Sequence, residues 1–240
     1  MRKITINLAA VAAFCIVVAS PALVSSSCAT PKTEQEDTTI IREDSGITAL
    51  KYSSPEVPAS IEFCGKTIDL SRFDRHERMD RELLAFTYMH STSLQMLKKA
   101  NRYFPIVEPI LKENGIPDDF KYLMVIESNM NPTARSSAGA AGLWQFMQGT
   151  GRDYGLEVNN NVDERYHIEK ATRAACRYLK DAYAKYKDWV AVAASYNAGQ
   201  ARIASQLAKQ DVDDSLDLQL VEETARYVYL SLIHISEPTR

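Results

Sequence analysis

Residues 117–127 read PDDFKYLMVIE, a segment with strong local signals for a helix. Proline suits the first turn of a helix, and acidic residues there interact favourably with the helix dipole. The segment therefore predicts a helix that begins near Pro117. Its later residues, 123–126, are all apolar and must be largely buried. Because the residue before a proline disfavours helix, the pair Asn131-Pro132 should end this helix soon after Glu127.

The chain around this helix also has helical periodicity. Apolar residues recur at helical spacing from Asp80, and no convincing strand alternation occurs between residues 80 and 230. We expect Pro105 and Pro109 to interrupt the stretch before the quoted helix, Gly115 to end a helix, and residues 61–70 to form a short extended segment. Further helices are expected at 143–150, 168–187, 189–197, 200–209 and 215–229. The predicted fold class is mainly α.

Composition excludes some classes of protein. The 240 residues are 45% hydrophobic and 25% charged, which allows one globular domain or two small ones. The formal net charge is −3, without a block of like charges, so binding of nucleic acid through a basic surface is not expected.

The N-terminus is typical of an export signal. A basic start is followed by an apolar run at residues 8–19 and then by small residues through Ser27, so residues 1–27 are predicted to be a signal peptide. The run is too short to span a bilayer as a helix. Residues 25–28 read SSSC, which resembles a lipoprotein box with Cys28 as the lipidated residue. Ordinary cleavage after Ala22 or Ala29 is the alternative.

The two ends of the mature chain differ from its centre. Residues 28–60 are rich in Thr, Ser, Glu, Asp and Pro and are predicted to be a flexible tether, ahead of a folded domain at 61–230. Residues 231–240 do not continue the helical pattern, so they are interpreted as a foreign tail or as a frayed natural end. Cys64 and Cys176 either form a disulfide, as exported cysteines do, or remain thiols.

Glu127 is the candidate catalytic residue. A carboxyl at the end of a buried helix loses hydration, which penalises its charged form and raises its pKa. Such a group stays protonated near neutral pH, as a general acid requires. A glutamate at a helix end is more often an ordinary solvated residue, so the surrounding motifs must decide.

Several motifs follow Glu127-Ser128 in order. They read GLWQFM at 142–147, GRDYG at 151–155, ASYNAG at 194–199 and ETARY at 223–227. With this set, residues 69–229 resemble the soluble-lytic-transglycosylase catalytic domain, most closely that of exported lytic murein transglycosylases of the D type. One departure is Gln148, because the family usually carries proline after the methionine; it affects a helix entry and no catalytic group.

The resemblance implies a lysozyme-like helical domain, as in goose-type lysozyme, that acts on peptidoglycan in the periplasm or as an outer-membrane lipoprotein. It implies cleavage of the β-1,4 bond between N-acetylmuramic acid and N-acetylglucosamine, with Glu127 as acid and then base. The products would carry 1,6-anhydromuramic acid ends. We expect a monomer without cofactor or metal ion, and His76, His90 and His167 lack the spacing of metal ligands.

The resemblance also assigns substrate-binding positions. Ser136 would contact the acetamido group, Gln145 the sugar, and Met147 the apolar wall near the reacting ring. Tyr196 would hold the acetamido group and Glu127, and Asn197 would orient its helix. Glu223 and Tyr227, four apart on one helix face, would lie at the cleft floor. The ordinary alternative for Ser136 is a loop serine, for Met147 a core residue, and for Glu223 with Tyr227 an exposed pair. Trp144 is interpreted as a core residue.

The sequence is also consistent with two other functions. A goose-type lysozyme would use water as the nucleophile, with Asp153, Glu157 or Asp163 as a second carboxylate. A wall-binding protein would keep the fold without turnover.

Overall fold

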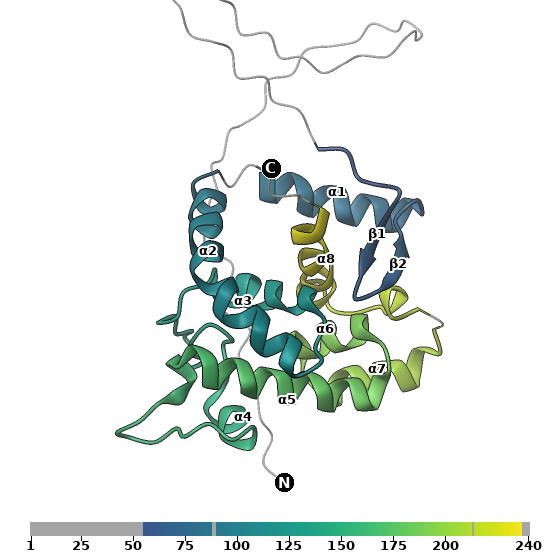
Figure 1. Ribbon diagram of the computed structural model, residues 1–240. Helices are drawn as coiled ribbons and strands as arrows, with labels where there is room; N and C mark the ends of the chain where they lie inside the picture. Colours follow the sequence, from purple (N-terminus) through teal and green to yellow (C-terminus); the bar gives the residue numbers. More distant parts are fainter. Residues whose placement is uncertain (1–54, 88–89, 213, 237–240) are drawn as a thin grey trace, which may run out of the picture. The chain divides into compact units, whose positions relative to one another are not determined.

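Helices make up most of the chain that the structure describes. The structure is a computed structural model, and it describes residues 55–87, 90–212 and 214–236 (Figure 1). The α-helices are α1 (Phe73–Thr87), α2 (His90–Glu113), α3 (Lys121–Ser128), α4 (Gln148–Asp153), α5 (Ile168–Tyr186), α6 (Trp189–Ala198), α7 (Gln200–Gln210) and α8 (Glu222–Ser236). Short 3-10 helices are η1 (Asp118–Phe120), η2 (Glu164–Tyr166) and η3 (Ser215–Asp217). The predicted mainly α class is confirmed.

The expected extended segment is a hairpin. Strand β1 (Ser60–Phe63) pairs antiparallel with β2 (Lys66–Asp69), and the turn residues Cys64 and Gly65 have φ values of 52° and 79°. Alternate residues of the two strands are buried, so one face of the hairpin packs on the helical core.

Helix α6 is the centre of the core. Its residues 190–195 are all buried, and a helix that is apolar on every side must be covered by neighbours. Helices α5, α7 and α8 pack around it (Figure 1). Helix α8 in turn packs on α1 and α3, so it joins the first part of the chain to the core.

Helix α2 continues through both prolines, so the expected interruption at Pro105 and Pro109 is wrong. The two residues are four apart and both are exposed. Their missing N–H groups therefore free backbone carbonyls on the solvent side of the helix, where water can bind them. The helix ends as expected before Gly115, whose φ is +66°.

Two helix boundaries also differ from the prediction. Residues 142–145 form turns, and the helix expected at 143–150 is α4, which begins at Gln148. The segment expected at 215–229 splits into η3 and α8, and α8 continues to Ser236. The expectation that the helical pattern stops at Tyr229 is therefore wrong, since Leu232 and Ile233 are completely buried.

The described cysteines are thiols. Cys64 is partly buried and Cys176 is buried, and neither is in a disulfide. The signal at 1–27, Cys28 and the tether through residue 54 lie outside the described residues. Among the described helices, none is long and apolar enough to cross a membrane.

An ion pair between the buried Glu82 and the exposed Arg226 fixes α8 against α1. The Glu82 side chain is completely buried and accepts hydrogen bonds from Arg226 Nε at 2.6 Å and Arg226 Nη2 at 2.9 Å. Arg81 Nε also donates to Glu82 at 3.1 Å. Arg226 directly precedes Tyr227 in the ETARY motif, so this pair helps to fix the position of Tyr227 on α8.

Replacing Arg226 should therefore destabilise the fold. Arg226→Met leaves the buried Glu82 carboxylate with Arg81 as its remaining partner, which should lower the free energy of unfolding by about 1–3 kcal/mol. Adding Glu82→Gln should recover part of the loss, because the buried group is then neutral. Urea unfolding measures both effects. The control Arg173→Met removes an exposed pair with Glu113 and should cost less than about 1 kcal/mol. Equal losses in the two single variants would contradict this assignment.

Candidate active site

Glu127 lies in the last turn of α3. Residues 123–125 of this helix are buried, which fixes the helix in the core, while Glu127 itself is partly buried. The chain turns away immediately afterwards, since Asn129 and Met130 have φ values of 50° and 52°. Asparagine tolerates the left-handed conformation, so Asn129 is a suitable residue to end the helix. The carboxyl thus stands at the edge of the core, as the sequence predicted.

Tyr227 contacts this carboxyl directly. Its Oη donates a hydrogen bond of 2.8 Å to Glu127 Oε1, which joins α8 to α3. The pKa of Glu127 is raised to about 7, because burial and the charge of Glu223 raise it by more than the bond from Tyr227 lowers it. Burial is the largest of these effects, so the group exchanges its proton near neutral pH.

Tyr196 is a second tyrosine near the carboxyl. Burial raises the pKa of the Tyr196 phenol, and the charge of Glu127 raises it further. The Tyr196 hydroxyl donates to the backbone oxygen of Trp144 at 2.8 Å. This hydrogen bond helps to fix the backbone of the GLWQFM motif. The sequence did not predict the contact.

Asn197 and Glu223 lie where α6 and α8 meet. Asn197 Oδ1 accepts a hydrogen bond of 2.9 Å from the hydroxyl of Thr224, the residue after Glu223. This contact connects the ASYNAG and ETARY motifs. Glu223 itself is exposed at the start of α8, one turn before Tyr227.

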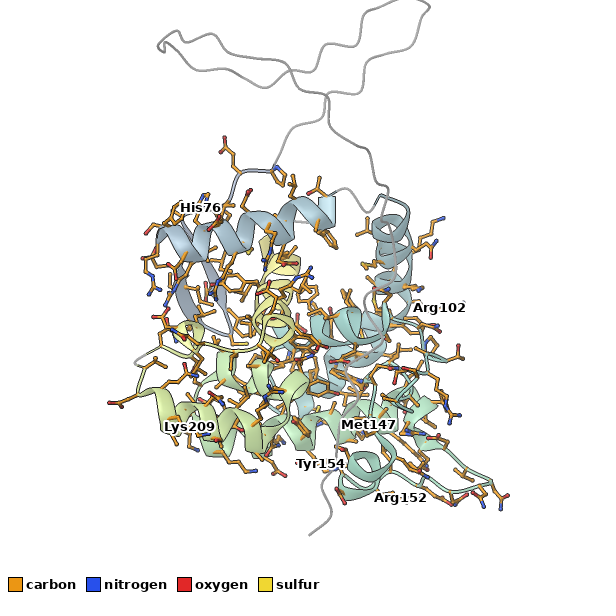
Figure 2. The ribbon with its side chains drawn as sticks, turned by 180° about the vertical axis from the view of Figure 1, so that it is seen from behind. His76, Arg102, Met147, Arg152, Tyr154 and Lys209 are labelled. Atoms are coloured by element: carbon orange, nitrogen blue, oxygen red, sulfur yellow. The ribbon has the colours of Figure 1, made fainter. Side chains whose placement is uncertain are left out.

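The remaining predicted positions belong to one irregular stretch, residues 132–147. Ser136 Oγ accepts from the Ala140 N–H at 3.0 Å. Gln145 has a φ of 48° and its amide donates to Gly142 O at 2.8 Å. Met147 is 45% exposed and directly precedes α4, where Figure 2 shows it at the same end of the molecule as the labelled Arg152 and Tyr154.

One hydrogen bond connects this stretch to the catalytic helix. Ser128, the residue after Glu127, donates to the backbone oxygen of Leu143 at 2.9 Å. The motifs ES and GLWQFM are thereby held together in space. Trp144 is completely buried and donates to Thr172 at 2.9 Å, so its interpretation as a core residue is confirmed.

The acids considered as second carboxylates have other contacts. Asp163 pairs with Arg165 at 2.6 Å. Glu157 accepts a hydrogen bond of 2.7 Å from Asn159, and Asp153 is exposed. Among the residues that the structure describes, no group of three or more His, Cys, Asp or Glu side chains is placed to hold a metal ion.

Arg165 is the residue that the sequence analysis missed. It is buried, and it donates to backbone oxygens at both ends of residues 139–146. A lone arginine in a polar stretch gives no signal of burial. The only hint in the sequence is Asp163 two residues earlier, which supplies the partner a buried guanidinium needs.

Comparison with known proteins agrees with this geometry. Residues 105–217 match the family model of the transglycosylase SLT domain. This match includes Glu127 and most of the motifs around it, which confirms the resemblance to the soluble-lytic-transglycosylase catalytic domain and supports the lysozyme-like fold expected from it. The chain is 31% identical over 157 residues to membrane-bound lytic murein transglycosylase D of Escherichia coli K12, covering 63% of this chain and 34% of that protein.

Two further relatives share shorter regions. Peptidoglycan transglycosylase gp16 of Escherichia phage T7 is 33% identical over 95 residues, covering 38% of this chain and 7% of that protein. The structure of an inactive mutant of the lytic transglycosylase Slt from Pseudomonas aeruginosa aligns with a TM-score of 0.48 and 23% identity, covering 55% of this chain and 23% of that one. The chain thus spans about a third of the length of the Escherichia coli relative.

The raised pKa of Glu127 predicts a pH-dependent stability. A carboxyl whose pKa is raised by folding contributes stability at low pH that is lost as pH rises from its unfolded value through about 7. Glu127→Gln cannot ionise, so at pH 8 it should be more stable than the wild type by about 1–3 kcal/mol. At pH 4 the difference should be much smaller.

Urea unfolding at the two pH values checks this. Glu77→Gln, at an exposed position of α1, is the control and should follow the wild type at both. A difference between Glu127→Gln and the wild type that is the same at pH 4 and pH 8 would disprove the assignment.

Proposed function

We propose that this protein is a peptidoglycan lytic transglycosylase. It would cleave the β-1,4 bond between N-acetylmuramic acid and N-acetylglucosamine and leave 1,6-anhydromuramic acid ends. The observation that carries the proposal is the carboxyl of Glu127, which has a pKa of about 7, sits at the end of a buried helix and accepts a bond from Tyr227. The match of residues 105–217 to the family model of the transglycosylase SLT domain supports the substrate class.

In the first step, Glu127 donates its proton to the glycosidic oxygen. A group with a pKa near the working pH is suited to this, because a large fraction is protonated while the proton remains acidic enough to transfer. The C1–O bond then breaks, and the acetamido carbonyl of the substrate stabilises the positive charge that develops at the anomeric carbon.

In the second step, Glu127 acts as a base. The carboxylate accepts the proton of the muramoyl C6 hydroxyl while that oxygen bonds to the anomeric carbon. The catalytic group is restored and no water is consumed. Because the nucleophile belongs to the same sugar, its effective concentration is high without a second protein carboxylate. Tyr227 would keep Glu127 oriented through both proton transfers.

We propose that the protein works in the cell envelope, where peptidoglycan lies. Residues 1–27 would direct export, and Cys28 would carry a lipid if the SSSC sequence is processed as a lipoprotein box. Residues 28–60 would then connect this anchor to a catalytic domain at 61–230. The word "membrane-bound" in the name of the Escherichia coli relative supports this arrangement.

A digest of purified peptidoglycan tests the reaction. Wild-type protein should release fragments whose masses are lower by one water than those of hydrolysed products. Glu127→Gln should reduce the rate by at least about 100-fold, since general acid–base catalysis contributes 10²–10⁴-fold, and should still bind the glycan. Fragments with hydrated reducing ends would identify a hydrolase, and full activity of Glu127→Gln would exclude this residue as the acid.

The two neighbours of Glu127 should move the pH profile in opposite directions. Tyr227→Phe removes a bond that lowers the pKa of Glu127, so the alkaline limb of kcat/KM should shift to higher pH. Glu223→Gln removes a charge that raises this pKa, so the limb should shift to lower pH. Each shift should be less than about one pH unit, since a hydrogen bond contributes about 1 kcal/mol and one pKa unit is about 1.4 kcal/mol. Shifts in the same direction would contradict the electrostatic account.

A further inference from the structure

Side chains hold the backbone of the GLWQFM motif in place. Residues 142–145 form turns and Phe146 forms an isolated β-bridge with Ala141, so backbone N–H groups reach only some of their carbonyls, those of Gly142 and Phe146 among them. Most of the carbonyl oxygens of residues 142–146 also accept from side chains of other segments or of the motif itself. The pairs are Gly142 O with Gln145 Nε2, Leu143 O with Ser128 Oγ, Trp144 O with Tyr196 Oη, and Phe146 O with Arg165 Nη1.

Arg165 donates hydrogen bonds both to the backbone of residues 139–146 and to the carboxylate of Asp163. Its Nη1 donates to Gly139 O at 2.8 Å and to Phe146 O at 2.9 Å, so one nitrogen connects both ends of residues 139–146. Its Nε and Nη2 bind the two oxygens of Asp163 at 2.8 and 2.6 Å. Only 4% of Arg165 is exposed, so these bonds are little weakened by competing water.

The backbone at Arg165 also touches this stretch. Gly142 has a φ of +79°, and a Cβ atom there would lie 1.9 Å from the backbone oxygen of Arg165. The aliphatic carbons of Arg165 lie 3.4 Å from the position of a Cβ at Gly151, in α4. Arg165 is therefore packed between the GLWQFM motif and the helix that follows Met147.

We propose that Arg165 is a positioning residue for substrate binding. It holds the stretch that carries Ser136, Gln145 and Met147 at a fixed distance from the catalytic helix. This inference rests on the proposed function. The proton chemistry should be independent of it, because Glu127 and Tyr227 lie on α3 and α8 and bond to each other.

Arg165→Lys is the most direct test. Lysine keeps the positive charge for Asp163, but its single nitrogen cannot reproduce the planar fork that binds the carboxylate and the backbone oxygens together. With purified peptidoglycan as substrate, kcat/KM should fall by about 10- to 100-fold, as small misplacements of binding groups do. The loss should lie mainly in KM, and the alkaline limb of the pH profile should stay at its wild-type position.

A binding measurement separates positioning from folding. In the Glu127→Gln background, Arg165→Lys should weaken the binding of a tetramer of N-acetylglucosamine by a similar factor. The matched control is Arg173→Lys, an exposed arginine on α5 that pairs with Glu113 and should leave KM, binding and the pH profile unchanged. If Arg165→Lys does not fold, Asp163→Asn keeps the arginine and should raise KM in the same direction by a smaller factor.

The outcomes are distinct. Wild-type KM and binding in Arg165→Lys, or in Asp163→Asn where the first variant does not fold, would overturn the positioning role and leave the proposed function intact. A shift of the alkaline limb would also overturn it, because Arg165 would then act on Glu127 itself. Full activity of Glu127→Gln would instead overturn the proposed function, whatever Arg165 does.

Discussion

The hydrogen bond from Tyr227 to Glu127 is the contact on which the rest of the site depends. It joins the end of α3 to α8 through two residues that are 100 positions apart in the chain. For this bond to form, both helices must be fixed independently. The buried apolar residues of α3 fix the first, and the packing of α8 on α6 and α1, together with the ion pair between Glu82 and Arg226, fixes the second.

Two acidic side chains, Glu82 and Glu127, have hydrogen-bond partners of different kinds. Glu82 is completely buried and accepts hydrogen bonds from the guanidinium groups of Arg81 and Arg226, an arrangement that holds helices together. Glu127 receives its bond from a neutral phenol, and burial then raises its pKa to about 7. The chemical identity of the partner separates a structural carboxylate from a group that can exchange a proton at neutral pH.

Much of the fold and part of the candidate site could be predicted from the sequence. The run from Pro117 to Glu127 has strong local signals, and so do the periodic apolar faces of α5 and the apolar residues of α6, and their bounds were close to those expected. The irregular stretch before α4 could not be predicted, because its shape depends on donors such as Arg165 and Tyr196 that come from distant parts of the chain. The interruption expected at Pro105 and Pro109 was wrong because both residues are exposed, which lets α2 continue. Their exposure depends on the tertiary structure and could not be predicted from the local sequence. Of the predicted site residues, Tyr227 has a direct bond to Glu127. The substrate-binding roles of all of them, Tyr227 included, stay predictions.

The role of Glu127 as the proton donor is tested most simply by measuring its pKa in the wild-type protein. A carbon-13 NMR titration of its side-chain carboxyl, assigned by comparison with Glu127→Gln, measures this value without any substrate. We expect a midpoint near pH 7. A midpoint near the usual glutamate value of about 4.3 would mean that the carboxyl is ionised at neutral pH and would contradict its role as the proton donor.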